Sequence, residues 1–144
     1  MRAVGVDLGE RRIGLALCDA AGTVVTPYDV VQRSGDQVRD RRAIAALVAE
    51  AEAEVVVVGV PYSLDGSVGP AARRALAEVE RLREVLPVPV ETYDERLTTV
   101  TAHRSLRETD LSGPARRRVV DQVAAAVVLQ GWLDRRAAQE DSTQ

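Results

Sequence analysis

An unbroken run of four valines, Val55-Val56-Val57-Val58, constrains the fold of this chain more than any other segment. Valine is β-branched and favours extended backbone. A strand without polar alternation is typical of a parallel sheet that is covered on both faces. Because helices must provide that cover, the run predicts an α/β domain.

The segments around this run predict the remaining elements. Apolar runs at 3–8 and 13–18 flank a polar turn, which indicates a β-hairpin. A third strand follows at 24–32, where Pro27 indicates an edge or a bend. The other expected elements are a helix over 36–53, a helix beginning at Pro70, a strand at 88–93, a short helix near 98–107 and a last helix from Pro114 to Arg136. Together they predict three layers, with a five-stranded mixed sheet flanked by helices.

Length and composition limit the organisation and the partners. A chain of 144 residues fits one domain, which we place at 1–138, with a flexible polar tail at 139–144. No apolar run approaches the roughly 20 residues of a membrane span. The single cysteine, Cys18, cannot form an internal disulfide, which favours the cytoplasm. The net charge of −3 argues against coating nucleic acid by bulk attraction, although all 19 basic residues are arginines suited to phosphate contacts.

Acidic residues occur at three places that could form one site: the ends of two strands and the last helix. Asp7 shares a strand face with Gly5, which leaves space beside the carboxylate. Asp94 and Glu95 end the fifth strand and point to opposite faces, so one of them is expected to reach the same site. Asp121 lies near the apolar stripe of the last helix and needs a basic partner, such as Arg117 or Arg118, or a metal.

Gathered carboxylates repel one another by about 4 kcal/mol per pair at 4 Å and an effective dielectric near 20. A divalent cation removes that repulsion, and Mg²⁺ prefers oxygen ligands of this kind. Two such ions can activate water and stabilise the leaving oxygen of a phosphodiester. Taken singly, each acid could instead be a turn cap, a solvated loop residue or a structural ion-pair partner.

Arginines accompany two of the acids. Arg11 and Arg12 lie at the hairpin tip beside Asp7, and Arg117 and Arg118 lie a turn before Asp121. We expect them to flank the scissile phosphate and to clamp the backbone without reading bases. The aromatic residues do not form a stacking strip along the sequence, so recognition of single strands by stacking is not predicted; they are Tyr28, Tyr62, Tyr93 and Trp132.

Four motifs occur in the order found in the bacterial YqgF/RuvX family, which this chain resembles over nearly its whole length. They are Val4-Gly5-Val6-Asp7-Leu8-Gly9 with Arg12-Ile13-Gly14, Val58-Gly59-Val60-Pro61 with Asp65-Gly66, Asp94-Glu95-Arg96-Leu97-Thr98-Thr99, and Val120-Asp121 with Ala124-Ala125-Ala126. Cys18 departs from the family pattern, where serine is usual, but it touches no acid.

The resemblance implies a ribonuclease-H-like fold and a metal-dependent nuclease. Members are described as Holliday junction resolvases or as nucleases that mature the 5′ end of pre-16S ribosomal RNA. By position, it implies that Asp7, Glu95 and Asp121 are catalytic and hold Mg²⁺ or Mn²⁺, with Arg96 near the phosphate. Glu95 is thus preferred to Asp94 by analogy alone.

Several alternatives remain open at this stage. The substrate is precursor RNA or a four-way DNA junction, and the protein is a monomer or a homodimer. The domain could instead bind nucleic acid or protein without cleaving anything. A phosphate-binding hairpin of the actin-like ATPase kind fits poorly, because those proteins need two such domains around the nucleotide.

Overall fold

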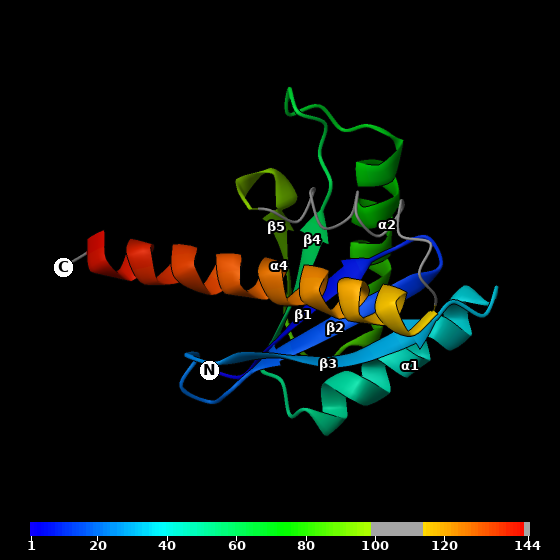
Figure 1. The fold of residues 1–144 in the computed structure, drawn as a ribbon, viewed down its shortest axis with the longest axis horizontal. Helices are drawn as coiled ribbons and strands as arrows, with labels where there is room; N and C mark the ends of the chain where they lie inside the picture. The colour runs from blue at the N-terminus through cyan, green and yellow to red at the C-terminus, as the bar shows by residue number, and fades with distance from the viewer. Residues whose placement is uncertain (99–113, 143–144) are drawn as a thin grey trace.

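The computed structural model describes residues 1–98 and 114–142, with side chains described for 1–98 and 121–140. Five strands form one sheet in the order β3-β2-β1-β4-β5. They are β1 (Ala3–Leu8), β2 (Arg12–Cys18), β3 (Val25–Gln32), β4 (Val55–Val60) and β5 (Val90–Asp94). β2 runs antiparallel to both β1 and β3, whereas β1, β4 and β5 are parallel. The predicted mixed sheet is therefore confirmed, with the valine run in β4 between two parallel neighbours (Figure 1).

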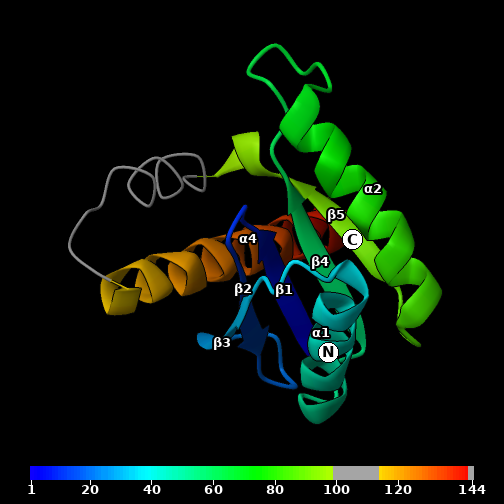
Figure 2. The ribbon, with the colours of Figure 1, turned by 90° about the vertical axis from the view of Figure 1, so that its right-hand side faces the viewer.

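Helices cover both faces of the sheet and make three layers. In the part of the chain that the structure describes, the helices are α1 (Gln37–Glu50), α2 (Pro70–Val85), the short 3₁₀ helix η1 (Glu95–Leu97) and α4 (Pro114–Ser142). Figure 2 shows α1 and α2 on one side of the sheet and α4 on the other. The core is divided in the same way: Val4 and Val6 pack on the α1 and α2 side, while Ala125 and Leu129 of α4 pack on the opposite side.

Local signals in the sequence place several element ends. The Asp36 carboxylate accepts hydrogen bonds from the backbone N–H groups of Val38 and Arg39 and so caps the start of α1. Pro70 occupies the first turn of α2, where a missing N–H costs nothing. Pro27 lies on the edge strand β3, where the register with β2 shifts between Leu15 and Ala16, as the proline predicts.

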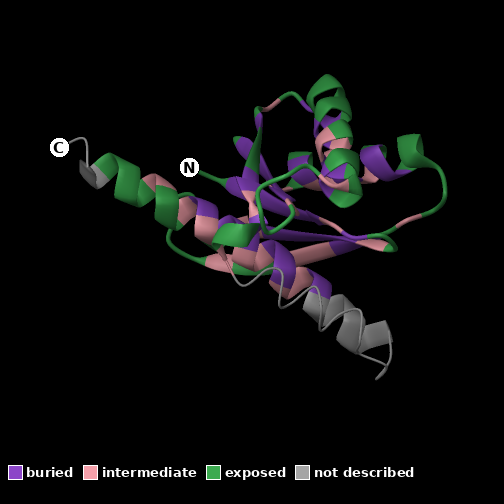
Figure 3. Ribbon diagram, turned by 90° about the horizontal axis from the view of Figure 1, so that it is seen from above, coloured by how far each residue is buried: buried purple, intermediate pink, exposed green. Residues whose placement is uncertain are grey.

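The last helix is longer than its sequence indicates. We expected it to end at Arg136, but α4 continues to Ser142. Arg136 and Glu140 form an i,i+4 ion pair at 3.6 Å in this extension, which adds a small stabilisation to the helix there. Figure 3 shows this last part of α4 extending beyond the sheet with mostly exposed residues. The flexible tail at 139–144 stays a prediction, and the short helix expected near 98–107 falls almost entirely outside the described residues.

No helix in the described part of the chain is long and apolar enough to cross a membrane.

Candidate active site at one end of the sheet

The first acid, Asp7, lies near the end of β1 on the face that α4 covers. Strand alternation sets this direction, because Val4 and Val6 point to the other face, and a Cβ added to Gly5 would contact Ala125 and Leu129 of α4. Asp7 has no exposed surface. Its carboxylate is thus held between the central strand and the long helix.

The second acid, Asp121, approaches Asp7 across β2. Gly14 is the direct partner of Asp7 in the antiparallel ladder. A Cβ at Gly14 would lie 2.3 Å from the backbone oxygen of Asp121 and 3.4 Å from its Cβ. Only glycine therefore lets α4 come this close to β2. The absence of a side chain at Gly14 brings Asp121 to the neighbourhood of Asp7.

The third acid, Glu95, approaches from the opposite side, across β4. Val58 pairs with Val6, so Gly59 is the residue of β4 that comes next to Asp7. A Cβ at Gly59 would lie 2.6 Å from Oε1 of Glu95. Glu95 begins η1 and is only 1% exposed, so its side chain turns inward beneath α4.

The three predicted acids thus gather on one face, at one end of three adjacent strands, with a glycine on each side of Asp7. Asp7, Glu95 and Asp121 are all buried. The geometry also separates Asp94 from Glu95, as strand alternation predicts, since Asp94 turns away to bind Arg96. As the side chains stand, no three Asp, Glu, His or Cys residues in the described part of the chain form a ready metal-binding group.

One arginine lies inside this site. Nε of Arg12 donates to Oδ2 of Asp121 over 2.5 Å, and the two side chains are only 13% and 1% exposed. For Asp121 we expected a basic partner such as Arg117 or Arg118, or a metal. Arg12 was not among these candidates because it is 109 residues away in sequence. The side chains of Arg117 and Arg118 lie outside the described residues. The Arg12 guanidinium neutralises one carboxylate of the group.

Arg11 and Arg12 therefore differ, although both come from the hairpin tip. Arg11 is exposed, and its backbone oxygen accepts a hydrogen bond of 2.9 Å from the N–H of Arg33. The Arg33 side chain also donates to the Gly9 oxygen over 2.7 Å. These two contacts fix the hairpin loop against the end of β3 and hold Arg11 at the rim of the site.

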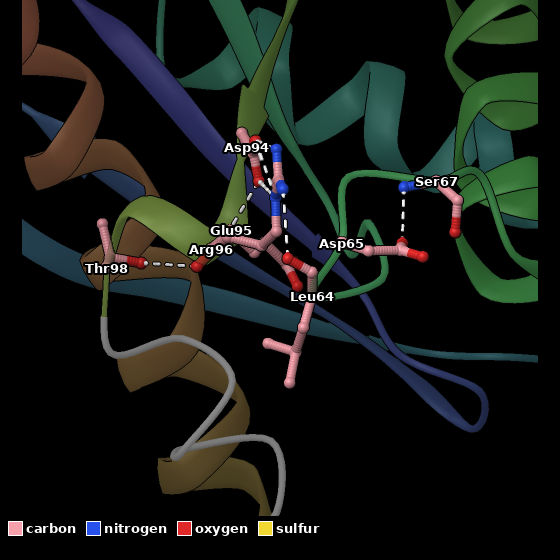
Figure 4. A network of polar contacts seen from close by, with 7 residues as sticks. All are labelled: Leu64, Asp65, Ser67, Asp94, Glu95, Arg96 and Thr98. Carbon is pink, nitrogen blue, oxygen red and sulfur yellow. Dashed lines mark hydrogen bonds and ion pairs between the residues drawn. The ribbon is translucent and has the colours of Figure 1, made fainter.

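Arg96 lies directly after Glu95 and is fixed by Asp94. The guanidinium donates to Oδ2 of Asp94 over 2.6 Å, and the backbone N–H of Arg96 donates to Oδ1 over 2.9 Å (Figure 4). The hydrogen bonds from the Arg96 side chain lower the pKa of Asp94 despite partial burial, so this carboxylate stays charged. On the neighbouring loop, Asp65 accepts from the N–H of Ser67, which stabilises the turn at Gly66 beneath Arg96.

Comparisons with known proteins agree with this arrangement. The chain matches the family model described as "RuvX: Holliday junction resolvase" over residues 1–135. A Rhodococcus opacus protein named "Putative pre-16S rRNA nuclease" is 49% identical over 140 residues, covering 94% of this chain and 79% of that protein. A protein of Mycobacterium sp. strain KMS with the same name is 47% identical over 138 residues, covering 95% of this chain and 82% of that one.

The fold has a counterpart among solved structures. RuvC of Thermus thermophilus, in complex with a Holliday junction substrate, matches this chain with a TM-score of 0.54 at 18% identity. The match covers 95% of this chain and 96% of the RuvC chain. At this identity the likeness bears on the fold alone. It confirms the expected ribonuclease-H-like architecture.

Proposed function

The chain belongs to the RuvX family, and we propose that it is a metal-dependent nuclease that processes the 5′ end of pre-16S ribosomal RNA. The observation that carries this proposal is the gathering of Asp7, Glu95 and Asp121 over the glycines that flank Asp7. Buried carboxylates repel one another, and a fold that collects them needs compensating positive charge. The names of the relatives supply the RNA substrate.

The donor set fits a hard divalent cation, either Mg²⁺ or Mn²⁺. Carboxylate oxygens are the ligands such ions prefer. Asp7 is the central candidate ligand, Glu95 reaches the site from the β4 side and Asp121 from the β2 side. Arg12 donates to Oδ2 of Asp121, so a cation held by this oxygen would have to displace the guanidinium. Once bound, the ion would polarise the phosphate and lower the pKa of an attacking water.

The protein's own groups supply positioning. Burial beneath α4 limits rearrangement of the acids, because Gly14 packs directly against Asp121 and Gly59 against Glu95. In this proposal, Arg11 at the hairpin rim and Arg96 on the β5 side would contact backbone phosphates on either side of the acids. We place this activity in the cytoplasm, whose reducing conditions fit the buried free thiol of Cys18.

The proposal is tested by offering two substrates to the same protein. Wild type and Asp7→Asn are incubated with Mn²⁺ or Mg²⁺ and either labelled precursor 16S RNA or a labelled four-way DNA junction. The expected result is cleavage of the precursor RNA near its mature 5′ end by wild type alone. Mass measurement in solution accompanies the assay, because symmetric junction cutting requires two active sites.

The other outcomes separate the alternatives. Paired cuts in the junction, made by a dimer that leaves the RNA intact, would replace the RNA nuclease with a junction resolvase. Binding of either substrate without metal-dependent cleavage would identify a non-catalytic nucleic-acid-binding module. Cleavage that survives in Asp7→Asn would show a contaminating nuclease or a different active site.

A further inference from the structure

A hollow of roughly 690 Å³ lies beside the candidate active site, on the outer side of β5. Its walls come from β5, the segment at η1, the loop after β4 and the second half of α4. Figure 1 shows that α4 crosses the sheet and continues past β5, which brings these segments together. The residues that matter for its chemistry are Tyr62, Tyr93, Trp132, Arg96, Arg135 and Arg136, and we call this group the arginine–aromatic hollow.

Three of the four aromatic residues of the chain meet here, although their sequence positions suggest no strip. Tyr93 and Trp132 are each 7% exposed and form the floor of the hollow. A Cβ at Gly131 of α4 would lie 2.6 Å from the hydroxyl oxygen of Tyr93, so α4 packs directly on this ring. Burial raises the pKa of Tyr93, which keeps its hydroxyl neutral and able to donate a hydrogen bond.

Guanidinium groups lie over two of the rings. The Arg96 guanidinium carbon is 5.8 Å from the centre of the Tyr62 ring, and that of Arg136 is 5.3 Å from the centre of the Trp132 ring. Stacking of this kind restrains a long side chain. The arginines are thus held in place before any ligand arrives.

The residues that line the hollow include more basic than acidic side chains. Three arginines face two acids, Glu91 and Asp94, among its lining residues, whereas the whole chain has a net charge of −3. Asp94 binds Arg96 and Glu140 binds Arg136, and Arg135 is exposed. Two of the three arginines are therefore paired with carboxylates, and Arg135 is the arginine most accessible to an anion.

We infer that the arginine–aromatic hollow binds one unpaired nucleotide of a nucleic-acid strand, with the phosphate at Arg135 and Arg136 and the base toward the aromatic residues. Its volume is within the range of about 300–1,000 Å³ of small-ligand sites and is too small for a duplex. Aromatic and guanidinium planes stack on any base, so binding should tolerate sequence changes. The inference rests on the proposed function for the identity of the strand, which would continue from the acids past Glu95 and Arg96 into the hollow.

Trp132 provides a direct readout, because it is the only tryptophan of the chain. A single-stranded oligouridylate of about eight nucleotides, within the usual site sizes for single strands, is titrated into Asp7→Asn protein without metal. Tryptophan fluorescence and anisotropy of the labelled oligonucleotide are followed together. We expect a saturable change in Trp132 fluorescence with the same midpoint as the anisotropy change.

Variants of exposed arginines test the contacts without disturbing the core. Arg135→Ala should weaken binding about tenfold, as loss of a charge-assisted hydrogen bond predicts, and should lower the slope of log affinity against log salt by about 0.7. Arg135→Lys should restore much of the affinity. Arg42→Ala is the matched control, because Arg42 is exposed on α1, which covers the opposite face of the sheet.

The outcomes keep this inference apart from the proposed function. Oligonucleotide binding without a Trp132 response, or unchanged affinity of Arg135→Ala, would overturn the inference even if wild type cleaves RNA. A Trp132 response that depends on Arg135 would support the hollow even if wild type cleaves no substrate. A response to polyglutamate in place of the oligonucleotide would also overturn it, by showing that the hollow takes acidic peptides.

Discussion

Removing the guanidinium of Arg12 should destabilise the metal-free protein strongly. Arg12→Ala removes the guanidinium that donates to the buried Asp121 carboxylate over 2.5 Å. Loss of one member of a buried ion pair costs about 3–5 kcal/mol, because the remaining charge stays desolvated. For a chain of this length, that corresponds to a fall in melting temperature of roughly 10–15 °C.

Divalent metal should reduce this loss. Without Arg12, the Asp121 carboxylate no longer has to exchange a guanidinium for the cation, so the variant should bind Mg²⁺ more tightly than wild type. The gain in stability from bound metal grows with concentration relative to Kd. Melting curves in EDTA and over a Mg²⁺ titration should therefore converge for the two proteins at high metal.

Two comparisons make the measurement specific. Arg2→Ala is the control, because its pair with Glu52 is 3.8 Å long and joins side chains that are 47% and 79% exposed, so it should change stability by less than about 1 kcal/mol. The double variant Asp121→Asn/Arg12→Ala should lose less unfolding free energy than the two single variants lose together. The expected coupling energy is about 1–3 kcal/mol. A metal-free melting temperature of Arg12→Ala within about 2 °C of wild type, or additive effects, would refute the reasoning.

Three further changes test other parts of the site. Asp7→Asn should abolish cleavage while the metal-free melting temperature stays level or rises, because a repelling charge is removed; a clear fall would mark Asp7 as a structural ion-pair partner. Gly14→Ala places a Cβ 2.3 Å from the Asp121 backbone oxygen and should lower the free energy of unfolding in urea by about 3 kcal/mol. The control Gly69→Ala should lower it far less, because its Cβ meets only the Ser63 hydroxyl at 3.1 Å. Asp94→Asn should lose stability at neutral pH. The difference from wild type should vanish as the pH falls below 3.8 through the lowered pKa of Asp94, because the wild-type carboxyl group is then neutral, as the amide is at every pH. A difference that persists at low pH would contradict the ion-pair account.

The sheet could be predicted from the sequence because its signals are local. Hydrophobic alternation, the hairpin turn and the valine run each lie within one element, and the strands observed begin and end within about two residues of those expected. Pro27 indicated the edge strand for the same reason. The end of α4 was placed too early, because the helix continues beyond the end of its apolar stripe, where Arg136 pairs with Glu140.

The candidate site was predictable only in part. The acids were predicted from their places at strand ends and from the family resemblance. Their common environment depends on Gly14 and Gly59, and the role of these glycines appears only in the structure, where α4 and η1 pack against them. The pairing of Arg12 with Asp121 joins a hairpin to a helix 109 residues later, and no periodicity encodes it. The arginine–aromatic hollow was hidden in the same way, because Tyr62, Tyr93 and Trp132 come from three separate elements.

Arg12 was expected to clamp the nucleic-acid backbone, and its pairing with Asp121 connects that role to metal. If cation and guanidinium compete for Oδ2 of Asp121, metal binding releases Arg12, whose side chain can then reach a phosphate near the exposed Arg11. RNA affinity of wild type should then fall more steeply with salt in Mg²⁺ than in EDTA at equal ionic strength, by about 0.7 in log–log slope for one added phosphate contact to a single strand. The same change in Arg12→Ala should be absent. Product length is checked after each titration so that only uncut RNA is compared. Equal slopes for wild type in both conditions would mean that Arg12 stays with Asp121 when metal is bound, and the backbone contact at the hairpin would then belong to Arg11 alone.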